Sequence, residues 1–262
     1  MGQDGVVIRL VFLLRRSAGL SLSEFSDRWR LDHGPIVASH QTALGVLRYT
    51  QTHRLEDSMN EVMARARGGM EEPYDGVAEL WWSSEEALRD ASGSDAGRRA
   101  GEALLADEAE FIDLAASPLW LAHEYPQVNP TPETVVARPA SRIVKLHFPL
   151  RHPETMSMDE AQRYWRIQHG PLIRSMAPAM GMLRYQQVHR FETPLEAALR
   201  ASRGTHVEPY TGHAEAWFER AAGQPPEAAE AGRRAIEDER TFIDFGRSAI
   251  WIGKEHVFVD RM

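Results

Sequence analysis

The chain of 262 residues contains no cysteine. Disulfides, thiolate nucleophiles and zinc sites with sulfur ligands are therefore excluded. Positive charge is also scarce, because 30 Lys and Arg residues face 38 Asp and Glu residues, for a net charge of −8. A general nucleic-acid binder needs a basic surface to contact phosphates, so we expect no nucleic-acid partner.

Long apolar runs and phosphate-binding loops are missing as well. The longest apolar run near the start, VVIRLVFLL, contains Arg9 and is too short to cross a bilayer, and no small-residue cleavage site follows it. We interpret this run as a β-strand and expect a cytoplasmic protein with no membrane partner. No glycine-rich phosphate cradle is present, which argues against a nucleotide ligand.

The chain consists of two halves with similar sequences. Six of the seven tryptophans form pairs between the halves, at residues 29/165, 81/217 and 120/251. Three phrases recur with them: WRLDHGP as WRIQHGP, LRYTQTHRLE as LRYQQVHRFE, and RGGMEEPYDGVAELW as RGTHVEPYTGHAEAW. Such self-similarity is the mark of a tandem duplication. We assign the first repeat to residues 1–125, a proline-rich linker to 126–141 and the second repeat to 142–262.

Both repeats predict the element order βαββαβ, the ferredoxin-like motif of the α+β class. The first helix should begin at Ser21 or Ser23 and at Ser157. We expect Gly34-Pro35 and Gly170-Pro171 to end it and to place each proline in the first turn of a following short helix. The first and third strands should lie adjacent and parallel, with the second strand at an edge. A four-stranded sheet of this kind carries helices on one face, so the two repeats can bury their other faces against each other.

The motifs W…HGP, RYxQxHR and EPYxGxAExW resemble the EthD family of the dimeric α+β-barrel superfamily, and the resemblance covers nearly the whole chain twice. It implies that the two repeats close one barrel within the chain, as a fused dimer. Relatives by fold include cofactor-free isomerases, lyases and monooxygenases, and also haem-binding enzymes.

Strand alternation sorts side chains into two faces. The uniformly apolar face, with Leu10 and Phe12 in the first repeat and Leu146 and Phe148 in the second, should lie under the helices. The opposite face should line the barrel. Its first-repeat members are Arg9, Val11, Val77, Glu79 and Trp81, and their counterparts are Lys145, His147, His213, Glu215 and Trp217.

The repeats differ most informatively at two of these positions, where Val11 and Val77 face His147 and His213. Imidazole titrates near neutrality, and a carboxylate such as Glu215 can raise its pKa or fix its tautomer. We therefore predict an acid–base pair in a mostly apolar cavity. The expected substrate contacts there come from Lys145, Trp217, Glu79 and Trp81.

Other polar residues recur in both halves. His33 and His169 follow a tryptophan by four residues and should interact with the carbonyls at a helix C-terminus, with a substrate contact as the second interpretation. A face of strand two carries Tyr49, Gln51 and His53, and its counterpart carries Tyr185, Gln187 and His189. These faces form an amphipathic rim, an interface between units or the mouth of the pocket. In the last case, Tyr185 and His189 are catalytic candidates, and Gln187, Tyr49 and His53 are substrate contacts.

The first functional hypothesis is a cofactor-independent lyase or isomerase. His147 or His213 would act as general base or acid on a small, largely apolar substrate, aromatic or polyketide-like, with Glu215 orienting. The substrate class rests mainly on the family resemblance.

Three alternatives stay open. His147, His213 and Glu215 could hold a divalent metal, as a two-histidine, one-carboxylate set. A histidine could bind haem, which would make the chain an oxidoreductase or monooxygenase. The chain could also bind a small hydrophobic molecule without turnover. Separately, the fused barrel could form a homodimer.

Overall fold

The computed structural model describes residues 7–131, 135–220 and 226–262, so residues 132–134 of the predicted linker lie outside the described ranges. The first repeat comprises β1 (Ile8–Leu14), α1 (Leu22–Arg28), η1 (Trp29–His33), α2 (Gly34–Ser39), β2 (Arg48–Arg54), α3 (Ser58–Ala66), β3 (Gly76–Trp82), α4 (Glu85–Gly93), α5 (Asp95–Glu108) and β4 (Leu119–Val128). The second comprises β5 (Ile143–Leu150), α6 (Met158–Tyr164), η2 (Trp165–His169), α7 (Gly170–Met176), β6 (Met182–Arg190), α8 (Pro194–Arg203), β7 (Gly212–Glu219), α9 (Pro226–Glu239), η3 (Phe245–Arg247) and β8 (Trp251–Asp260). Strand β4 therefore extends into the first three residues of the predicted linker.

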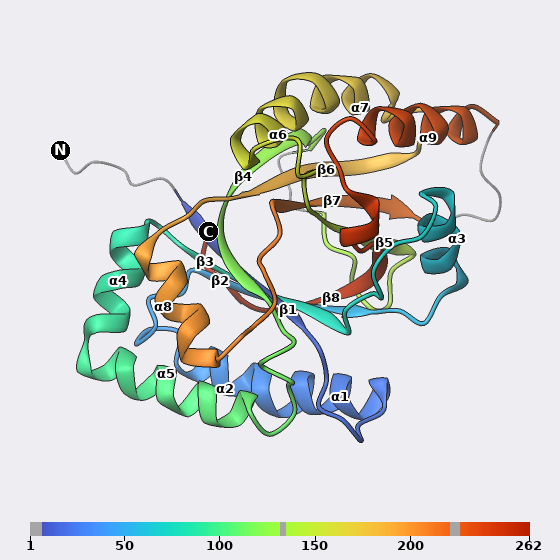
Figure 1. Ribbon diagram of the computed structural model, residues 1–262. Helices are drawn as coiled ribbons and strands as arrows, with labels where there is room; N and C mark the ends of the chain where they lie inside the picture. Colours follow the sequence, from blue (N-terminus) through green and yellow to red (C-terminus); the bar gives the residue numbers. More distant parts are fainter. Residues whose placement is uncertain (1–6, 132–134, 221–225) are drawn as a thin grey trace.

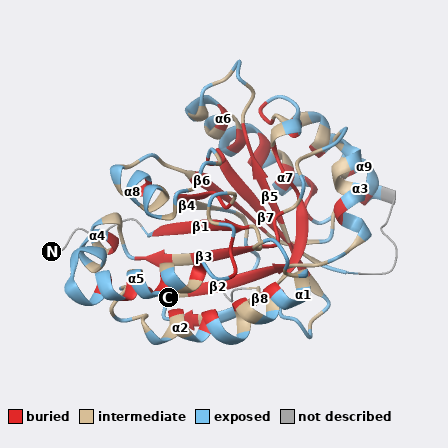
Figure 2. Ribbon diagram, turned by 60° about the horizontal axis from the view of Figure 1, so that its bottom comes forward, coloured by how far each residue is buried: buried red, intermediate tan, exposed pale blue. Residues whose placement is uncertain are grey.

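The strands close a single barrel in the order β1-β3-β2-β8-β5-β7-β6-β4. Each repeat contributes four consecutive strands, and the pairs β2–β8 and β4–β6 join the two repeats. The helices lie outside the barrel, and the buried strands form its centre (Figures 1 and 2). The predicted α+β fold, a fused-dimer barrel made by duplication, is confirmed.

Two details of the predicted sheet are wrong. Strands β1 and β3 pair antiparallel, as do β5 and β7. The crossover through the first helix makes β1 and β2 run the same way, and β2 and β3 pair antiparallel, so β3 must oppose β1. Strands β2 and β6 are not edges, because barrel closure gives each of them a neighbour from the other repeat.

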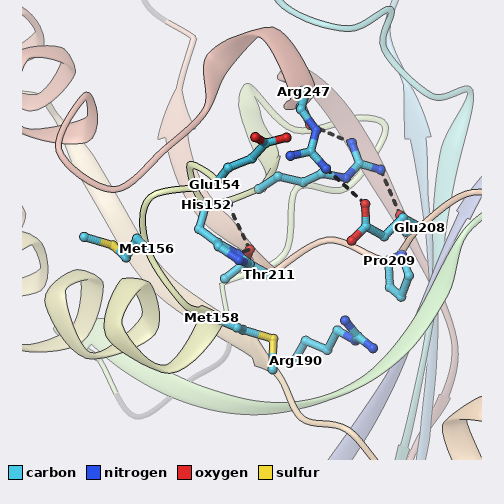
Figure 3. Close-up of a pocket in the computed structure, with 10 residues that line it drawn as sticks. His152, Glu154, Met156, Met158, Arg190, Glu208, Pro209, Thr211 and Arg247 are labelled. Atoms are coloured by element: carbon cyan, nitrogen blue, oxygen red, sulfur yellow. Dashed lines mark hydrogen bonds and ion pairs between the residues drawn. The ribbon is translucent and has the colours of Figure 1, made fainter.

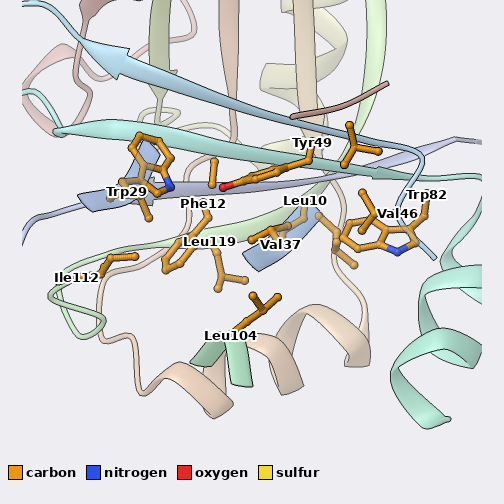
Figure 4. Packing of buried hydrophobic residues seen from close by; sticks show 14 of the residues in the cluster. Leu10, Phe12, Trp29, Val37, Val46, Tyr49, Trp82, Leu104, Ile112 and Leu119 are labelled. Atoms are coloured by element: carbon orange, nitrogen blue, oxygen red, sulfur yellow. The ribbon is translucent and has the colours of Figure 1, made fainter. Parts of the chain in front are cut away.

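The strand faces predicted to lie under the helices do so. In the first repeat, Leu10 and Phe12 pack with Trp29 and Tyr49 beneath the helices (Figure 4). Phe148 lies in the equivalent cluster of the second repeat. Helices α1 and α6 begin with matching capping boxes at Ser21 and Ser157, as the sequence predicts, with Ser21 rather than Ser23 as the cap.

The repeated Gly-Pro dipeptides begin short helices with the proline in the first turn, as predicted, but the chain does not leave the helical conformation before them. Residues 29–33 and 165–169 form π-helical turns that connect directly to α2 and α7. Each proline lies in the first turn of the continuing helix, where its missing N–H is tolerated. The Trp29 carbonyl accepts the Gly34 N–H within the π-turn and also the side-chain amide of Gln51, at 2.9 Å.

The histidine of the repeated phrase binds a side chain rather than helix carbonyls, which corrects the prediction for His33 and His169. The Nδ1 atom of His33 lies 2.7 Å from a carboxylate oxygen of Asp107 at the end of α5. The same contact joins His169 to Asp238 on α9 at 2.7 Å. Both imidazoles are buried against a phenylalanine ring. The repeated histidine therefore fastens each π-turn to the long helix of its own repeat.

Bidentate ion pairs then fasten the helices of one repeat to those of the other. Arg67, just after α3, contacts Glu239 of α9 at 2.8 and 2.9 Å. Arg203 of α8 contacts Glu108 of α5 at 2.9 and 3.0 Å. Helix α3 lies beside α9 although the two belong to different repeats (Figure 1). These pairs are largely buried, so removing one partner would leave a charge without compensation.

We predict that His169→Gln lowers the free energy of unfolding by about 1–2 kcal/mol, because it removes the imidazole that contacts the half-buried Asp238 and leaves this carboxylate with the Tyr164 hydroxyl. Urea denaturation measures the change, and His33→Gln should behave alike. The exposed His206→Gln serves as the control and should differ little from the parent. An unchanged stability in both variants would contradict a structural role for the repeated histidine.

Candidate active site in the barrel interior

The side chains predicted to face away from the helices meet inside the barrel. Each of the eight central ones has at most 2% of its surface exposed. They are Arg9, Val11, Val77, Glu79, Lys145, His147, His213 and Glu215. Trp81 and Trp217 lie on the same inner face, with 4% and 2% exposed. The period of two along each strand therefore sorted these residues correctly.

Two carboxylates and two cations form the centre of this interior. Lys145 Nζ lies 2.7 Å from Glu79 and 2.7 Å from Glu215. Arg9 lies 3.3 Å from Glu79 and 2.9 Å from Glu215. Each carboxylate thus contacts both cations. Such balance is what permits four charges to be buried together, because each desolvated ion keeps opposite charges as neighbours.

A further carboxylate from each repeat extends the network. Glu124 of β4 contacts Arg9 at 3.0 Å, and Glu255 of β8 contacts Lys145 at 3.2 Å. Glu124 also accepts a hydrogen bond from the Trp81 indole at 2.7 Å, and the second repeat forms the same bond between its counterparts. Sequence reasoning missed both carboxylates. The signal was the recurrence of LAHE and IGKE, in which Glu124 and Glu255 share strand parity with the paired tryptophans.

The ion pairs determine the protonation of this centre. Burial would raise the pKa of Glu79, but the charges of Arg9 and Lys145 outweigh it and lower this pKa to about 2. At Glu215, the charges of Arg9 and Lys145 again outweigh burial and hold its pKa well below the usual value. Burial would lower the pKa of Lys145, but Glu215 and Glu79 raise it. All of these groups are therefore charged at neutral pH.

The two histidines lie beside this network and differ in their hydrogen-bond partners. Their rings are stacked with centroids 5.4 Å apart. His213 Nε2 lies 3.1 Å from Glu215 and 3.2 Å from Arg9. Neither ring nitrogen of His147 has a hydrogen-bond partner among the described residues. Burial, and next the charge of Lys145, hold the pKa of His147 well below its usual value. His147 is therefore a neutral imidazole at neutral pH.

Aromatic rings fill the remaining interior, where the sequence predicts a mostly apolar cavity. Six rings form a closed circle with neighbouring centroids 5.4 to 6.2 Å apart. In order around the circle they are Tyr74, Trp251, His147, His213, Trp120 and Tyr210. The buried, unpartnered nitrogens include the indole N–H groups of both tryptophans. The space beside the histidines is thus occupied by other side chains in this structure.

A metal ion can be tested against the donor set. Ligand atoms of Glu79, His147, His213 and Glu215 lie within 4.8 Å of one another, so this buried group could hold an ion by spacing alone. Lys145 Nζ, however, already lies at hydrogen-bonding distance from both carboxylates. A metal would have to displace this ammonium group, so the charges present do not fit a resident ion.

Haem fits no better at His147. A porphyrin needs open space beside a ring nitrogen, but His147 is 0% exposed. Its ring is stacked between those of His213 and Trp251, at 5.4 and 6.0 Å.

The remaining predicted site residues lie on the other side of the sheet, under the helices. His189 stacks on Trp165 with ring centroids 4.5 Å apart, and Gln187 donates to the Trp165 carbonyl at 2.8 Å. Tyr185 accepts a hydrogen bond from the same indole at 3.0 Å. In the first repeat, His53 stacks on Trp29 in the same way, at 4.3 Å, and Tyr49 packs nearby. These residues surround the π-turn and do not share a site with His147.

Comparison with known proteins identifies the family. The model of the EthD domain matches residues 17–115 and again residues 153–246. No curated protein sequence matches the chain.

Solved structures agree with the architecture. An anthrone oxidase-like protein is similar with a TM-score of 0.58 at 12% identity, over 99% of this chain and 96% of the other. A proposed monooxygenase from Fusobacterium nucleatum subsp. nucleatum has a TM-score of 0.50 at 6% identity, over 97% and 95%. At these identities, the likeness shows the fold alone.

None of the helices in the described residues is both long enough and apolar enough to cross a membrane.

We predict that Lys145→Met lowers the free energy of unfolding by about 3–5 kcal/mol, because it leaves Glu79 and Glu215 buried with one cation fewer. Urea denaturation at pH 7 measures the loss. Arg142→Met is the matched control, since Arg142 is 71% exposed and its pair with Glu219 should contribute about 1 kcal/mol or less. Equal effects of the two substitutions would show that the buried network contributes little.

Acid titration of the unchanged protein gives an independent prediction. The pKa of Glu79 is lowered to about 2, so its stabilising contribution is complete above the unfolded value near 4.3. This contribution should disappear as the pH falls from about 4 through 2. Glu79→Gln should show a shallower fall of stability over this range. A parallel fall in both proteins would mean that Glu79 is not ionised in the folded state.

Proposed function

The chain belongs to the EthD domain family, in two copies, and we propose that it is an enzyme that moves a proton on a small, largely apolar molecule. His147 is the group that takes the proton and returns it. The proposal is a reaction of the lyase or isomerase type that needs no cofactor. The circle of aromatic rings beside His147 favours an aromatic substrate, because such a ring can stack where these rings now lie.

The observation that carries the proposal is the unpartnered imidazole of His147. A buried polar group without a hydrogen bond costs about 1–3 kcal/mol, so such groups are rare and call for an explanation. The neighbouring charges of Glu79, Glu215 and Lys145 are all paired, whereas both nitrogens of His147 are not. A substrate O–H or activated C–H would supply the missing partner.

The surrounding charges suit the anion that proton removal creates. His147 is neutral and can accept a proton, and Lys145 and Arg9 place fixed positive charge near the enolate or phenolate that results. His147 then returns the proton at a second position of the substrate, and the ring of His213, held by Glu215, is stacked beside it. The substrate loses one proton and regains one, so no electron acceptor is required.

Substrate access requires one end of the barrel to open. We place the opening at the end where β3 and β7 begin, where Tyr74 and Tyr210 lie with their hydroxyl groups 3.3 Å apart. Tyr210 donates to Glu71 at 2.5 Å, and the Arg15 guanidinium lies over the Tyr74 ring at 4.1 Å. Glu71 and Arg15 are only partly buried, so these contacts can exchange with water more easily than the inner network. In the proposal, outward movement of the two phenols exposes the histidines.

The experiment uses exchange of substrate hydrogen with solvent. We predict that His147→Val and His213→Val each lower deuterium incorporation from D₂O into enolisable aromatic ketones, such as anthrone or 2-tetralone, by about 10²–10⁴. Valine is the first repeat's own residue at both positions, so the fold should accept it. Mass spectrometry measures the incorporation, and the exposed His206→Val is the control.

The pH profile separates His147 from an ordinary surface histidine. Because the pKa of His147 is held well below its usual value, the acid limb of the rate should fall at a pH clearly under 6.5. Exchange at the parent rate in both valine variants would remove the histidines from the chemistry. Binding of these ketones without exchange would identify a binding protein instead.

A further inference from the structure

A cavity of about 330 Å³ lies in the second repeat, outside the barrel. It is located where β5 ends and α6 begins, beside the end of β6 and the start of β7 (Figure 3). His152 and Thr211 lie on one side of it, Arg190 and Arg247 bring two guanidinium groups, and the side chains of Met156 and Met158 add apolar surface. A volume of this size lies at the lower end of the range of small-molecule sites.

The first repeat fills the same place with a salt bridge. Arg16 and Asp75 stand where the second repeat has His152 and Thr211, and they form an ion pair. Arg16 also donates from Nε to the Leu20 carbonyl at 2.9 Å. Arg54, the counterpart of Arg190, contacts the same Asp75 at 3.1 Å. Three charged side chains in contact therefore stand at positions that line the cavity in the second repeat.

The second repeat lacks the carboxylate that contacts both arginines in the first repeat. Thr211 Oγ1 lies 2.7 Å from His152 Nδ1, a smaller and neutral pair. Without an acid at position 211, Arg190 contacts Glu196 of α8 instead, at 2.7 Å. Glu196 itself stands where the first repeat has the neutral Asn60. The repeats therefore differ at this place. The first repeat has the same fold with three charged side chains here, so the fold does not require the cavity.

The electrostatic surroundings favour an anion. Arg247 contacts Glu208, but this carboxylate is 70% exposed and holds the pair only weakly. Burial lowers the pKa of His152, and the charges of Arg247 and Arg190 lower it further against the effect of Glu208. A negative group in the cavity could therefore pair with Arg247, which can exchange the exposed Glu208 for a ligand at little cost, whereas Arg190 stays paired with Glu196.

We propose that this cavity binds a small organic carboxylate, with its anionic group beside Arg247 and His152 and its apolar body against Met156 and Met158. The site is separate from the barrel interior, and its occupation does not require the chemistry proposed for His147. The same place in the first repeat, filled by Arg16 and Asp75, binds no such ligand.

The test compares benzoate with benzamide, which has nearly the same shape but no charge. Isothermal titration at low ionic strength should show benzoate binding at least tenfold more tightly than benzamide. The double variant His152→Arg/Thr211→Asp copies the first repeat's salt bridge into the cavity and should weaken benzoate binding at least tenfold. His206→Arg, exposed and outside the cavity, adds positive charge without filling the space and should leave binding unchanged.

A single variant guards against misfolding of the double one. Arg247 is 41% exposed, so Arg247→Gln should leave the fold intact, and it should weaken benzoate about tenfold through loss of one charge-assisted contact. Equal affinity for benzoate and benzamide, full benzoate affinity in either cavity variant, or no benzoate binding at millimolar concentration would overturn the proposal.

Discussion

Two buried glutamates that face each other across the pseudo-twofold axis constrain the rest of this molecule. Glu79 and Glu215 are copies of one ancestral position, and closing the barrel brings both into a dry interior. Two carboxylates at such a place cannot both ionise unless cations accompany them. Arg9 and Lys145, also copies of one position, supply the charge from the strands paired with β3 and β7. Barrel closure and charge balance therefore depend on each other.

The duplication explains which residues are free to change. A feature that both repeats keep, such as the His–Asp contact at each π-turn, is accounted for by the fold that each repeat must make. Val11 and Val77 show that the barrel accepts apolar side chains where the second repeat has His147 and His213. The fold therefore does not demand these imidazoles. The same reasoning applies to the cavity beside His152, whose counterpart in the first repeat is filled.

Much of the architecture and part of the candidate site could be predicted from the sequence, for identifiable physical reasons. Side chains alternate along a strand with a period of two, so the inward direction of Lys145, His147 and Glu215 followed from their apolar neighbours. The sequence could not show that the predicted cavity is filled. Tyr74 and Tyr210 reach the interior from loops, and the course of these loops depends on the closed barrel. The π-turn was also unpredictable, since a Gly-Pro dipeptide is equally compatible with a helix end.

The balance of charge inside the barrel also explains why the histidines can differ from their surroundings. The charges of Glu79 and Glu215 raise the pKa of His147 and the charge of Lys145 lowers it, so these neighbouring charges oppose one another. Burial then determines its state, and burial favours the neutral imidazole. In an unbalanced, acidic interior the same residue would be an imidazolium ion fixed in a salt bridge and unable to accept a proton. The paired charges that permit the barrel to close are thus also the condition under which a histidine within it can act as a base.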